Sequence, residues 1–388
     1  MTEGRLRLIL PEGQESIFGT GPKSAEVCAR ILREDFFSKC VHYGDVGFGE
    51  AFVDGDWDTE DITGVISWMI LNVENHPTMM DSRKKKIAVN FMGFLNNLRH
   101  SFRSNTISNS KKNISAHYDL GNDFFRLFLD PGMTYSSAYF SEGNESLEEA
   151  QEKKYAELCR KLRLSPGDRV LEIGSGWGGF ALHAVKHHRC KVTTITISKE
   201  QHAYASERFG RAGITGSAEA KLVDYRHVKG QFDKIASIEM IEAVGHDYLD
   251  AYFAQCHKLL KRDGLLGLQM ILAPDHRYES FRRRPDWIQK HIFPGGFIPS
   301  FEAVLRAIRR TGDLGLLDYQ DMTPHYARTL NTWRRNFGKA SESVKAFGFD
   351  EAFVRKWNYY FSYCEAAFMM RNIGVAQAIF TRPNNHTL

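Results

Sequence analysis

The stretch that decides the fold is Val170–Phe180, with the sequence VLEIGSGWGGF. An apolar run of strand-forming residues ends at Gly174, and three more glycines follow within the next five positions. A segment with helix-forming residues, Ala181 to Lys186, comes next. This order predicts a strand, a tight turn and a helix. Glycines let a ligand approach the backbone closely, and a helix N-terminus offers unpaired N–H groups.

The spacing of the glycines, G-x-G-x-G-G, differs from the G-x-G-x-x-G of dinucleotide-binding folds. Glu172 lies just before the turn, where its carboxylate would repel a pyrophosphate but could pair with an ammonium group. The loop therefore favours S-adenosylmethionine as the ligand. A nucleotide site or a purely structural glycine turn stays open on this motif alone.

The bulk composition is that of a globular protein in a reducing cellular compartment. The 388 residues suffice for one large domain and a smaller one, and the net charge of +4 does not require nucleic acid. No stretch is apolar enough to span a bilayer, and the N-terminus has no signal-peptide core. The six cysteines are scattered without a C-x-x-C, which predicts buried thiols rather than disulfides or zinc ligands. We expect a cytoplasmic protein with no metal ion.

Composition divides the chain into three parts. Residues 1–82 predict a small α/β domain, with a strand over Leu6–Leu10 and helices over Ser24–Phe37 and Asp61–Asn75. Residues 83–113 predict a basic linker whose first half suits a helix at a membrane surface, although a solvated face with an interdomain packing stripe explains this stretch better. Residues 114–388 predict one catalytic domain.

Strand-like and helix-like segments alternate in the third part, which predicts a mostly parallel sheet with helices on both faces. The segment Ala273–Arg310 breaks this alternation and predicts a lid or a substrate insertion. The predicted helices include Lys199–Arg208 and Leu249–Leu260. The predicted strands are Arg169–Ile173, Lys191–Ile197, Ala220–Val223, Phe232–Ile238 and Leu265–Ile271.

Polar residues follow the successive predicted strands, at the edge where such sheets bind ligands. Thr196 and Gln201 come after the second strand and could reach ribose hydroxyls. Asp224 and Tyr225 come after the third, where an acid can accept from the adenine amine and a ring can stack on adenine. The fourth strand is followed by two carboxylates three residues apart, Glu239 and Glu242. Any one of them could be an ordinary surface residue, but their joint placement indicates a binding site.

Seven segments together resemble the cyclopropane fatty acid synthase family, which includes cyclopropane-fatty-acyl-phospholipid synthases and mycolic acid cyclopropane synthases. They cover about Asn113 to Phe380, and residues 47–57 also resemble the extra N-terminal domain of the bacterial and plant enzymes. The segments are HYDLGND (117–123), YSSAYF (135–140), LEIGSGWGG (171–179), TISKEQ (196–201), DYR (224–226), EAVG (242–245) and IFPGG (292–296).

The resemblance implies a class I, Rossmann-like methyltransferase that acts on unsaturated acyl chains of membrane phospholipids. A cis double bond attacks the methyl group of S-adenosylmethionine, and the resulting carbocation loses a proton and closes to a cyclopropane. A bound bicarbonate takes that proton. A fatty acyl C-methyltransferase that leaves a methyl or methylene branch is the alternative, since it handles the same cation differently. A lipid-binding protein without catalysis and a small-molecule methyltransferase fit the chain less well. We expect a homodimer at the inner face of the membrane.

The resemblance also assigns the residues of the site. Glu242 and Tyr326 would hold the bicarbonate, and Ser137 and Gln269 would donate to it from the same pocket. Many relatives have Cys in place of Ser137, and the best-known bacterial form has His in place of Gln269. On this basis a Glu242→Gln variant should be inactive. His117 and Tyr118, which are flanked by aromatic residues, are the last catalytic candidates. They could stabilise the cation, or they could simply pack in the core. The residues assigned to the cofactor are Tyr135, Ser136, Glu172, Gly174, Gly176, Thr196, Gln201, Asp224, Tyr225 and Ile238.

Overall fold

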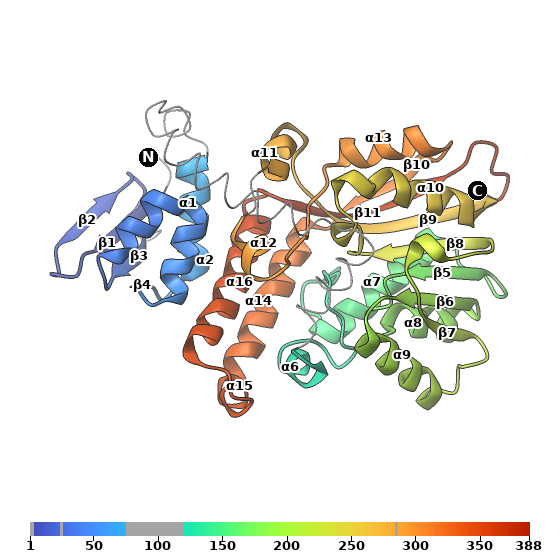
Figure 1. Ribbon diagram of the computed structural model, residues 1–388, viewed down its shortest axis with the longest axis horizontal. Coiled ribbons are helices and arrows are strands. Elements are labelled where there is room, and N and C mark those ends of the chain that lie inside the picture. Colours follow the sequence, from blue (N-terminus) through green and yellow to red (C-terminus); the bar gives the residue numbers. More distant parts are fainter. Residues whose placement is uncertain (1–3, 24–25, 75–119, 284–285) are drawn as a thin grey trace.

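The computed structural model describes residues 4–23, 26–74, 120–283 and 286–388. The predicted basic linker over residues 83–113, its membrane-surface helix, and the site candidates His117 and Tyr118 lie outside the described residues. A small N-terminal unit and a large α/β unit are joined through a long helical pair (Figure 1).

The large unit is built on a sheet that has seven strands within the described residues, in the order β10-β11-β9-β8-β5-β6-β7. Strands β5 to β9 pair in parallel, and β11 is antiparallel to both β9 and β10. The predicted mostly parallel sheet is therefore confirmed, with β5 and β8 at their predicted bounds. The strands are β5 (Arg169–Ile173), β6 (Lys191–Thr196), β7 (Ala218–Leu222), β8 (Phe232–Ile238), β9 (Leu260–Leu272), β10 (Gly315–Asp321) and β11 (Gly374–Thr381).

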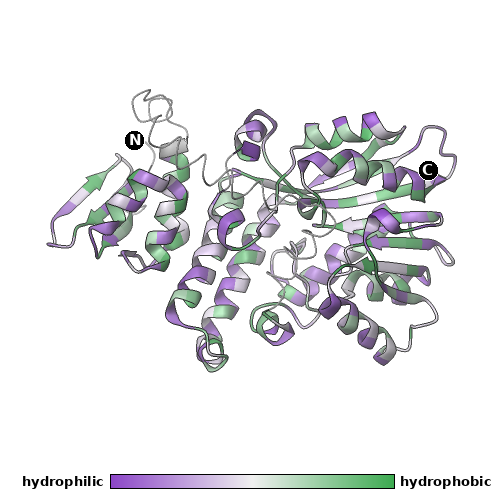
Figure 2. Ribbon diagram, viewed as in Figure 1, coloured by the Kyte–Doolittle hydropathy of each residue, from purple (hydrophilic) through white to green (hydrophobic). Residues whose placement is uncertain are grey.

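Helices cover both faces of this sheet because neighbouring residues of each strand point in opposite directions. On one face, Val170 of β5 packs with helices α7 (Leu147–Lys161), α8 (Gly179–His188) and α9 (Lys199–Arg211). On the other face, Leu171 packs with α10 (Leu249–Leu259) and α13 (Phe301–Thr311). These helices carry both hydrophobic and hydrophilic residues (Figure 2), as one-sided packing requires. No helix in the described ranges has the length and hydropathy needed to cross a bilayer.

The position of α13 corrects the expectation for Ala273–Arg310. Ser300 caps α13 by accepting from the backbone N–H of Ala303, and the apolar residues Val304, Ala307 and Ile308 are buried against the sheet layer. The end of the segment thus continues the α/β alternation. Only its first part, with the short helices α11 (Tyr278–Arg283) and α12 (Trp287–His291), lies outside it.

Among the described residues, the N-terminal unit contains a sheet in the order β2-β1-β3-β4 and two α-helices. The helix predicted over Ser24–Phe37 was wrong in its first half, where Glu26–Ile31 forms β3 in parallel with β1. Val27 and Ile31 suit either a helical or a strand period, and pairing with β1 decides the outcome. The elements are β1 (Arg5–Ile9), β2 (Glu15–Phe18), α1 (Asp35–Val53), β4 (Trp57–Asp58) and α2 (Ile62–Met69).

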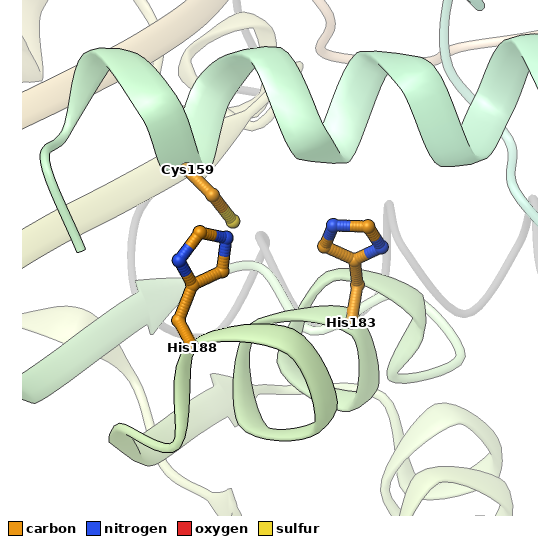
Figure 3. A group of neighbouring side chains, drawn as sticks. All are labelled: Cys159, His183 and His188. Carbon is orange, nitrogen blue, oxygen red and sulfur yellow. The ribbon is translucent and has the colours of Figure 1, made fainter. Parts of the chain in front are cut away.

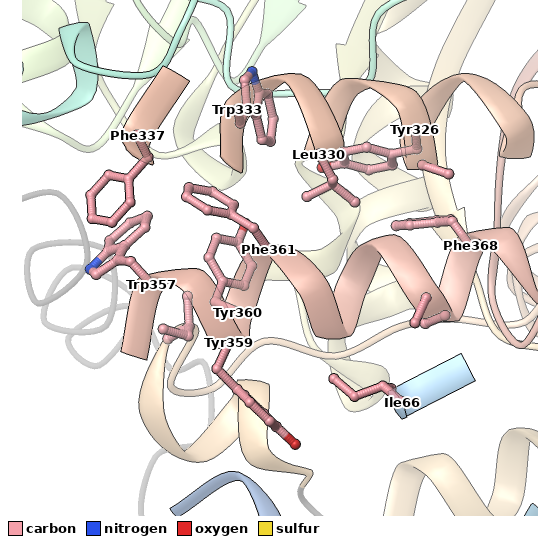
Figure 4. Packing of buried hydrophobic residues seen from close by; sticks show 14 of the residues in the cluster. Ile66, Tyr326, Leu330, Trp333, Phe337, Trp357, Tyr359, Tyr360, Phe361 and Phe368 are labelled. Atoms are coloured by element: carbon pink, nitrogen blue, oxygen red, sulfur yellow. The ribbon is translucent and has the colours of Figure 1, made fainter. Parts of the chain in front are cut away.

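Helix α2 confirms the start of the predicted Asp61–Asn75 helix and docks the N-terminal unit onto the rest of the chain. It packs against α16 (Glu351–Met369), which in turn lies along α14 (Thr323–Lys339). The Thr63 hydroxyl of α2 donates to the buried carboxylate of Glu365 at 3.0 Å. Figure 4 shows the packed side chains at this junction: Ile66, Tyr326, Leu330, Trp333, Phe337, Trp357, Tyr359, Tyr360, Phe361 and Phe368.

We expect Phe361→Ala to lower the free energy of unfolding by roughly 3–5 kcal/mol, because the ring is fully buried between the helices and its loss leaves a cavity. Phe347, 51% exposed at the end of the neighbouring helix, is the matched control, and its change to Ala should have an effect of about 0.5 kcal/mol or less. Denaturant unfolding measures both. Equal effects would contradict the packing described for α14 and α16.

Candidate functional site

The glycine loop between β5 and α8 has a backbone conformation that residues other than glycine adopt only with strain. The φ angles of Gly174, Gly176 and Gly178 are 95°, 47° and 82°. A Cβ on Gly174 would come within 2.9 Å of the Met240 side chain. A Cβ on Gly176 would meet nothing within 4 Å, so the space beside this backbone is open. The loop can therefore admit a ligand directly against the main chain.

The carboxyl ends of β6 and β7 bring two predicted pairs of cofactor residues to the same edge as this loop. Thr196 donates through its hydroxyl to Oε1 of Gln201 at 3.0 Å, and both side chains are buried. Asp224 accepts from Nε and Nη2 of Arg226 at 2.8 and 2.7 Å, and these contacts help to hold its pKa below the usual range despite burial. Sequence reasoning missed this partnership between Asp224 and Arg226.

The segment that precedes α7 supplies two more of the predicted cofactor residues, Tyr135 and Ser136. The Tyr135 and Tyr360 hydroxyls lie 2.9 Å apart, and the Ser136 hydroxyl accepts from Nζ of Lys154 at 2.8 Å. Lys154 is completely buried on α7. Sequence reasoning missed this residue, because a lysine in a helix is usually exposed. Its position four residues from each of the buried Ala150 and Leu158 is the signal that could have found it.

The carboxylate of Glu239 is the point where three predicted donors converge. Its Oε1 accepts from the Ser137 backbone N–H at 2.8 Å and from Nε2 of Gln269 at 2.7 Å. Its Oε2 accepts from the Tyr326 hydroxyl at 2.8 Å. These are the residues expected to bind bicarbonate together with Glu242. The Ser137 hydroxyl, expected to be a donor to that ion, instead donates to the carbonyl of Ala138 at 3.1 Å.

Glu242 lies on the short 3₁₀ turn Ile241–Ala243 and has different surroundings. Its Oε1 accepts from the Ile271 backbone N–H at 2.5 Å, and its buried Oε2 has no hydrogen-bond partner among the described residues. Burial, and next the charge of Glu239, raise the pKa of Glu242 to about 8. Burial also raises the pKa of Glu239, but its three donors and Lys154 oppose that rise. Two neighbouring carboxyls thus differ in their tendency to ionise.

This arrangement allows a test of whether the residues fit a bicarbonate ion. The ion needs hydrogen-bond donors, and Ser137 N–H, Gln269 and Tyr326 already donate to Glu239. A second anion would compete for these donors and would be repelled by the Glu239 carboxylate. As the side chains lie, they do not fit the group.

A second group of polar side chains lies between α7 and α8, away from the strand ends. The ligand atoms of Cys159, His183 and His188 lie within 4.8 Å of one another (Figure 3). Nδ1 of His183 is 2.5 Å from a carboxylate oxygen of Glu152, and burial raises the pKa of the Cys159 thiol well above its usual range. The Nδ1 of His183 is thus already bound to a carboxylate, and this group carries no functional assignment.

Comparison with known proteins identifies the family. Residues 105–378 match the family model described as mycolic acid cyclopropane synthetase. The chain belongs to this family. It is therefore an S-adenosylmethionine-dependent methyltransferase, and the resemblance stated from the sequence is confirmed.

Three relatives show how far the similarity extends. The chain is 35% identical over 355 residues to tuberculostearic acid methyltransferase UfaA1 of Mycobacterium tuberculosis, covering 89% of this chain and 81% of the relative. It is 34% identical over 362 residues to cyclopropane-fatty-acyl-phospholipid synthase of Escherichia coli, covering 92% and 89%. Mycolic acid cyclopropane synthase CmaA1, solved with S-adenosylhomocysteine and CTAB, has a TM-score of 0.65 at 31% identity, covering 70% of this chain and 98% of that one.

Proposed function

We propose that this enzyme transfers the methyl carbon of S-adenosylmethionine to a cis double bond in the acyl chain of a membrane phospholipid and closes a cyclopropane ring. The observation that carries the proposal is the meeting of the open glycine loop with the paired carboxyls at one edge of the sheet. The E. coli relative, whose name states this activity, matches over both the N-terminal unit and the α/β unit, which supports a phospholipid as the substrate.

In this proposal the alkene π electrons form a bond to the methyl carbon, and the bond from that carbon to sulfur breaks. The positive charge then lies on the neighbouring chain carbon. The partly exposed ring of Tyr135 can stabilise such a cation, and so can the Glu239 carboxylate. A base removes a proton from the added methyl, and the released C–H pair closes the ring.

Two groups are candidates for the base that removes the proton from the added methyl group. The resemblance implies bicarbonate, but its expected donors are bound to Glu239. The other is a carboxylate of the site itself. The fate of the same cation also separates the two candidate products. The similarity to tuberculostearic acid methyltransferase UfaA1 supports a methyl or methylene branch as the second candidate.

The lipid product tests the proposed function directly. Phospholipids with cis-unsaturated chains are incubated with the enzyme and S-adenosylmethionine, and the acyl chains are analysed by mass spectrometry. We expect S-adenosylhomocysteine to form together with chains that gain one CH₂. Mild catalytic hydrogenation should then leave these chains unchanged, since a cyclopropane resists conditions that saturate a methylene group. Uptake of hydrogen by the chains that gained CH₂ would indicate a branched product that keeps a double bond, such as a methylene branch. Absence of S-adenosylhomocysteine would contradict transfer to lipid.

Association with the inner face of the membrane and a homodimer are part of the same proposal. An acyl chain lies within a bilayer, so the enzyme must reach the lipid surface, and basic residues add about 1 kcal/mol each near anionic lipid. The sequence offers two basic patches for this contact, residues 83–86 and residues 282–284, and the first lies outside the described residues. In the other, Arg282 and Arg283 both pair with Glu279 at 2.8 and 3.1 Å, which reduces their attraction for lipid.

A further inference from the structure

The hydrogen bonds to Glu239 come from parts of the chain that are far apart in sequence. Ser137 belongs to the loop before α7, Gln269 to β9 and Tyr326 to α14. The amide of Gln269 is itself oriented, because its Oε1 accepts from Nε2 of Gln377 on β11 at 3.1 Å. A carboxylate that receives three such directed donors occupies a built anion site.

The backbone at Glu239 supports the same view. Its φ angle of 47° lies in the left-handed region, which glutamate seldom adopts. The residue follows directly after β8, and its N–H donates to the Gln269 carbonyl at 2.7 Å. Strained backbone of this kind persists where the surrounding contacts hold it, and it is concentrated at functional sites. The conformation lets Glu239 extend from the strand end, with part of its surface still accessible.

A buried cation accompanies this anion. Lys154 is fully buried, and its Nζ donates to the hydroxyl of Ser136, the residue beside Ser137. Burial lowers the pKa of Lys154 to about 8, and the carboxylate of Glu239 is the largest influence that opposes the fall. Buried charges are tolerated where they are paired and hydrogen-bonded. Lys154 is thus a buried positive charge whose field favours the ionised form of Glu239.

We propose that the Glu239 carboxylate, in place of a bound bicarbonate, takes the proton from the added methyl group, and that Lys154 keeps this carboxylate ionised. The inference rests on the proposed function. The methyl C–H bond breaks, its electron pair forms the last ring bond to the cationic carbon, and the proton moves to a Glu239 oxygen. Glu239 then returns the proton to water before the next turnover. Glu239 is the catalytic residue and Lys154 is a positioning residue.

The first test compares bicarbonate dependence with the loss of Glu239. Wild-type turnover in degassed, carbonate-free buffer should equal turnover with bicarbonate restored. Glu239→Gln should lose about 10²–10⁴-fold in kcat, the usual contribution of a positioned base. Calorimetry should show that the variant still binds S-adenosylmethionine, which also reports that it is folded. Glu207→Gln, an exposed glutamate paired with Arg211 on α9, is the control that should keep wild-type turnover.

A second variant keeps the test decisive if glutamine disturbs the donors. Glu239→Ala leaves Ser137 N–H, Gln269 and Tyr326 without their acceptor, so added bicarbonate should enter and restore part of the lost rate. The inference is overturned if wild-type turnover requires bicarbonate, or if Glu239→Gln keeps wild-type kcat. If wild type forms no S-adenosylhomocysteine from unsaturated phospholipid, the proposed function fails instead, so the two failures are distinguishable.

Lys154 is tested by the pH profile of kcat. The ionisable groups around Glu239 are Lys154 on α7, Glu242 on the 3₁₀ turn, Tyr326 on α14 and Tyr360 on α16. Without the lysine charge the pKa of Glu239 rises. As the pH is lowered, Glu239 is then protonated earlier, so kcat begins to fall at a higher pH than in wild type. We expect Lys154→Met to move this acid limb upward by about one pH unit. Lys161→Met, a buried lysine on the same helix paired with Asp318, should leave it unchanged. An unmoved limb in Lys154→Met would overturn its assigned role.

Discussion

Gly176→Val should abolish binding of S-adenosylmethionine. The backbone of Gly176 has a φ of 47°, and the space where its Cβ would lie is open in the described structure. A valine side chain would fill the space that the proposed cofactor site needs beside the glycine loop, and it would also strain the turn. Isothermal titration calorimetry should detect no binding at ligand concentrations that saturate wild type.

Two further glycines separate ligand exclusion from backbone strain. Gly213, with a φ of 67° and nothing within 4 Å of its Cβ position, lies in the exposed turn after α9. Gly213→Val carries similar strain but should bind the cofactor as wild type does. Gly210→Ala, at an unstrained helical position with open space, should also be neutral for binding. If Gly176→Val binds with unchanged affinity, the cofactor does not lie against this loop.

Glu242→Ala should lower kcat by roughly 10²–10⁴-fold while cofactor binding survives, because the carboxyl lies beside the reacting carboxylate. With a pKa of about 8, Glu242 is mostly protonated at neutral pH, and it can donate from Oε2 while Oε1 accepts from Ile271 N–H. Alanine removes this donor and leaves the Ile271 N–H without its acceptor. Steady-state kinetics with calorimetry as the folding control measures the loss.

Glu242→Gln should retain most of the activity at neutral pH, since an amide supplies one acceptor and one donor as a protonated carboxyl does. This differs from the sequence-based expectation, which took Glu242 as charged beside bicarbonate. An inactive Glu242→Gln together with an inactive Glu242→Ala would show that the ionised form is needed. That result would return Glu242 to the role of the base.

Much of the α/β unit could be predicted from local patterns. The apolar run before Gly174, the four glycines and the following helix are contiguous, so the strand, turn and helix can be identified without distant contacts. Polar residues after successive strands gather at one edge because parallel strands end together. The motifs of the family are likewise contiguous segments, which is why the resemblance was visible in the chain.

Tertiary structure alone decided the features that depend on pairing between distant segments. Residues 26–31 form a strand because β1 lies beside them, although the spacing of their apolar residues also permits a helix. Lys154 is buried because its helix packs on the sheet with that face inward.

Which of two carboxylates receives the donors was also a tertiary outcome. Glu239 and Glu242 are three residues apart and chemically identical, so the local pattern could place both carboxylates at the strand end, and only the family resemblance pointed to Glu242. Folding brings Ser137, Gln269 and Tyr326 to Glu239 and leaves Glu242 with one backbone donor. The sequence by itself determined the mostly parallel sheet, the glycine loop and the types of polar side chain at the strand ends. The ionisation of each carboxyl was decided only in the folded protein, because burial and neighbouring charges set it.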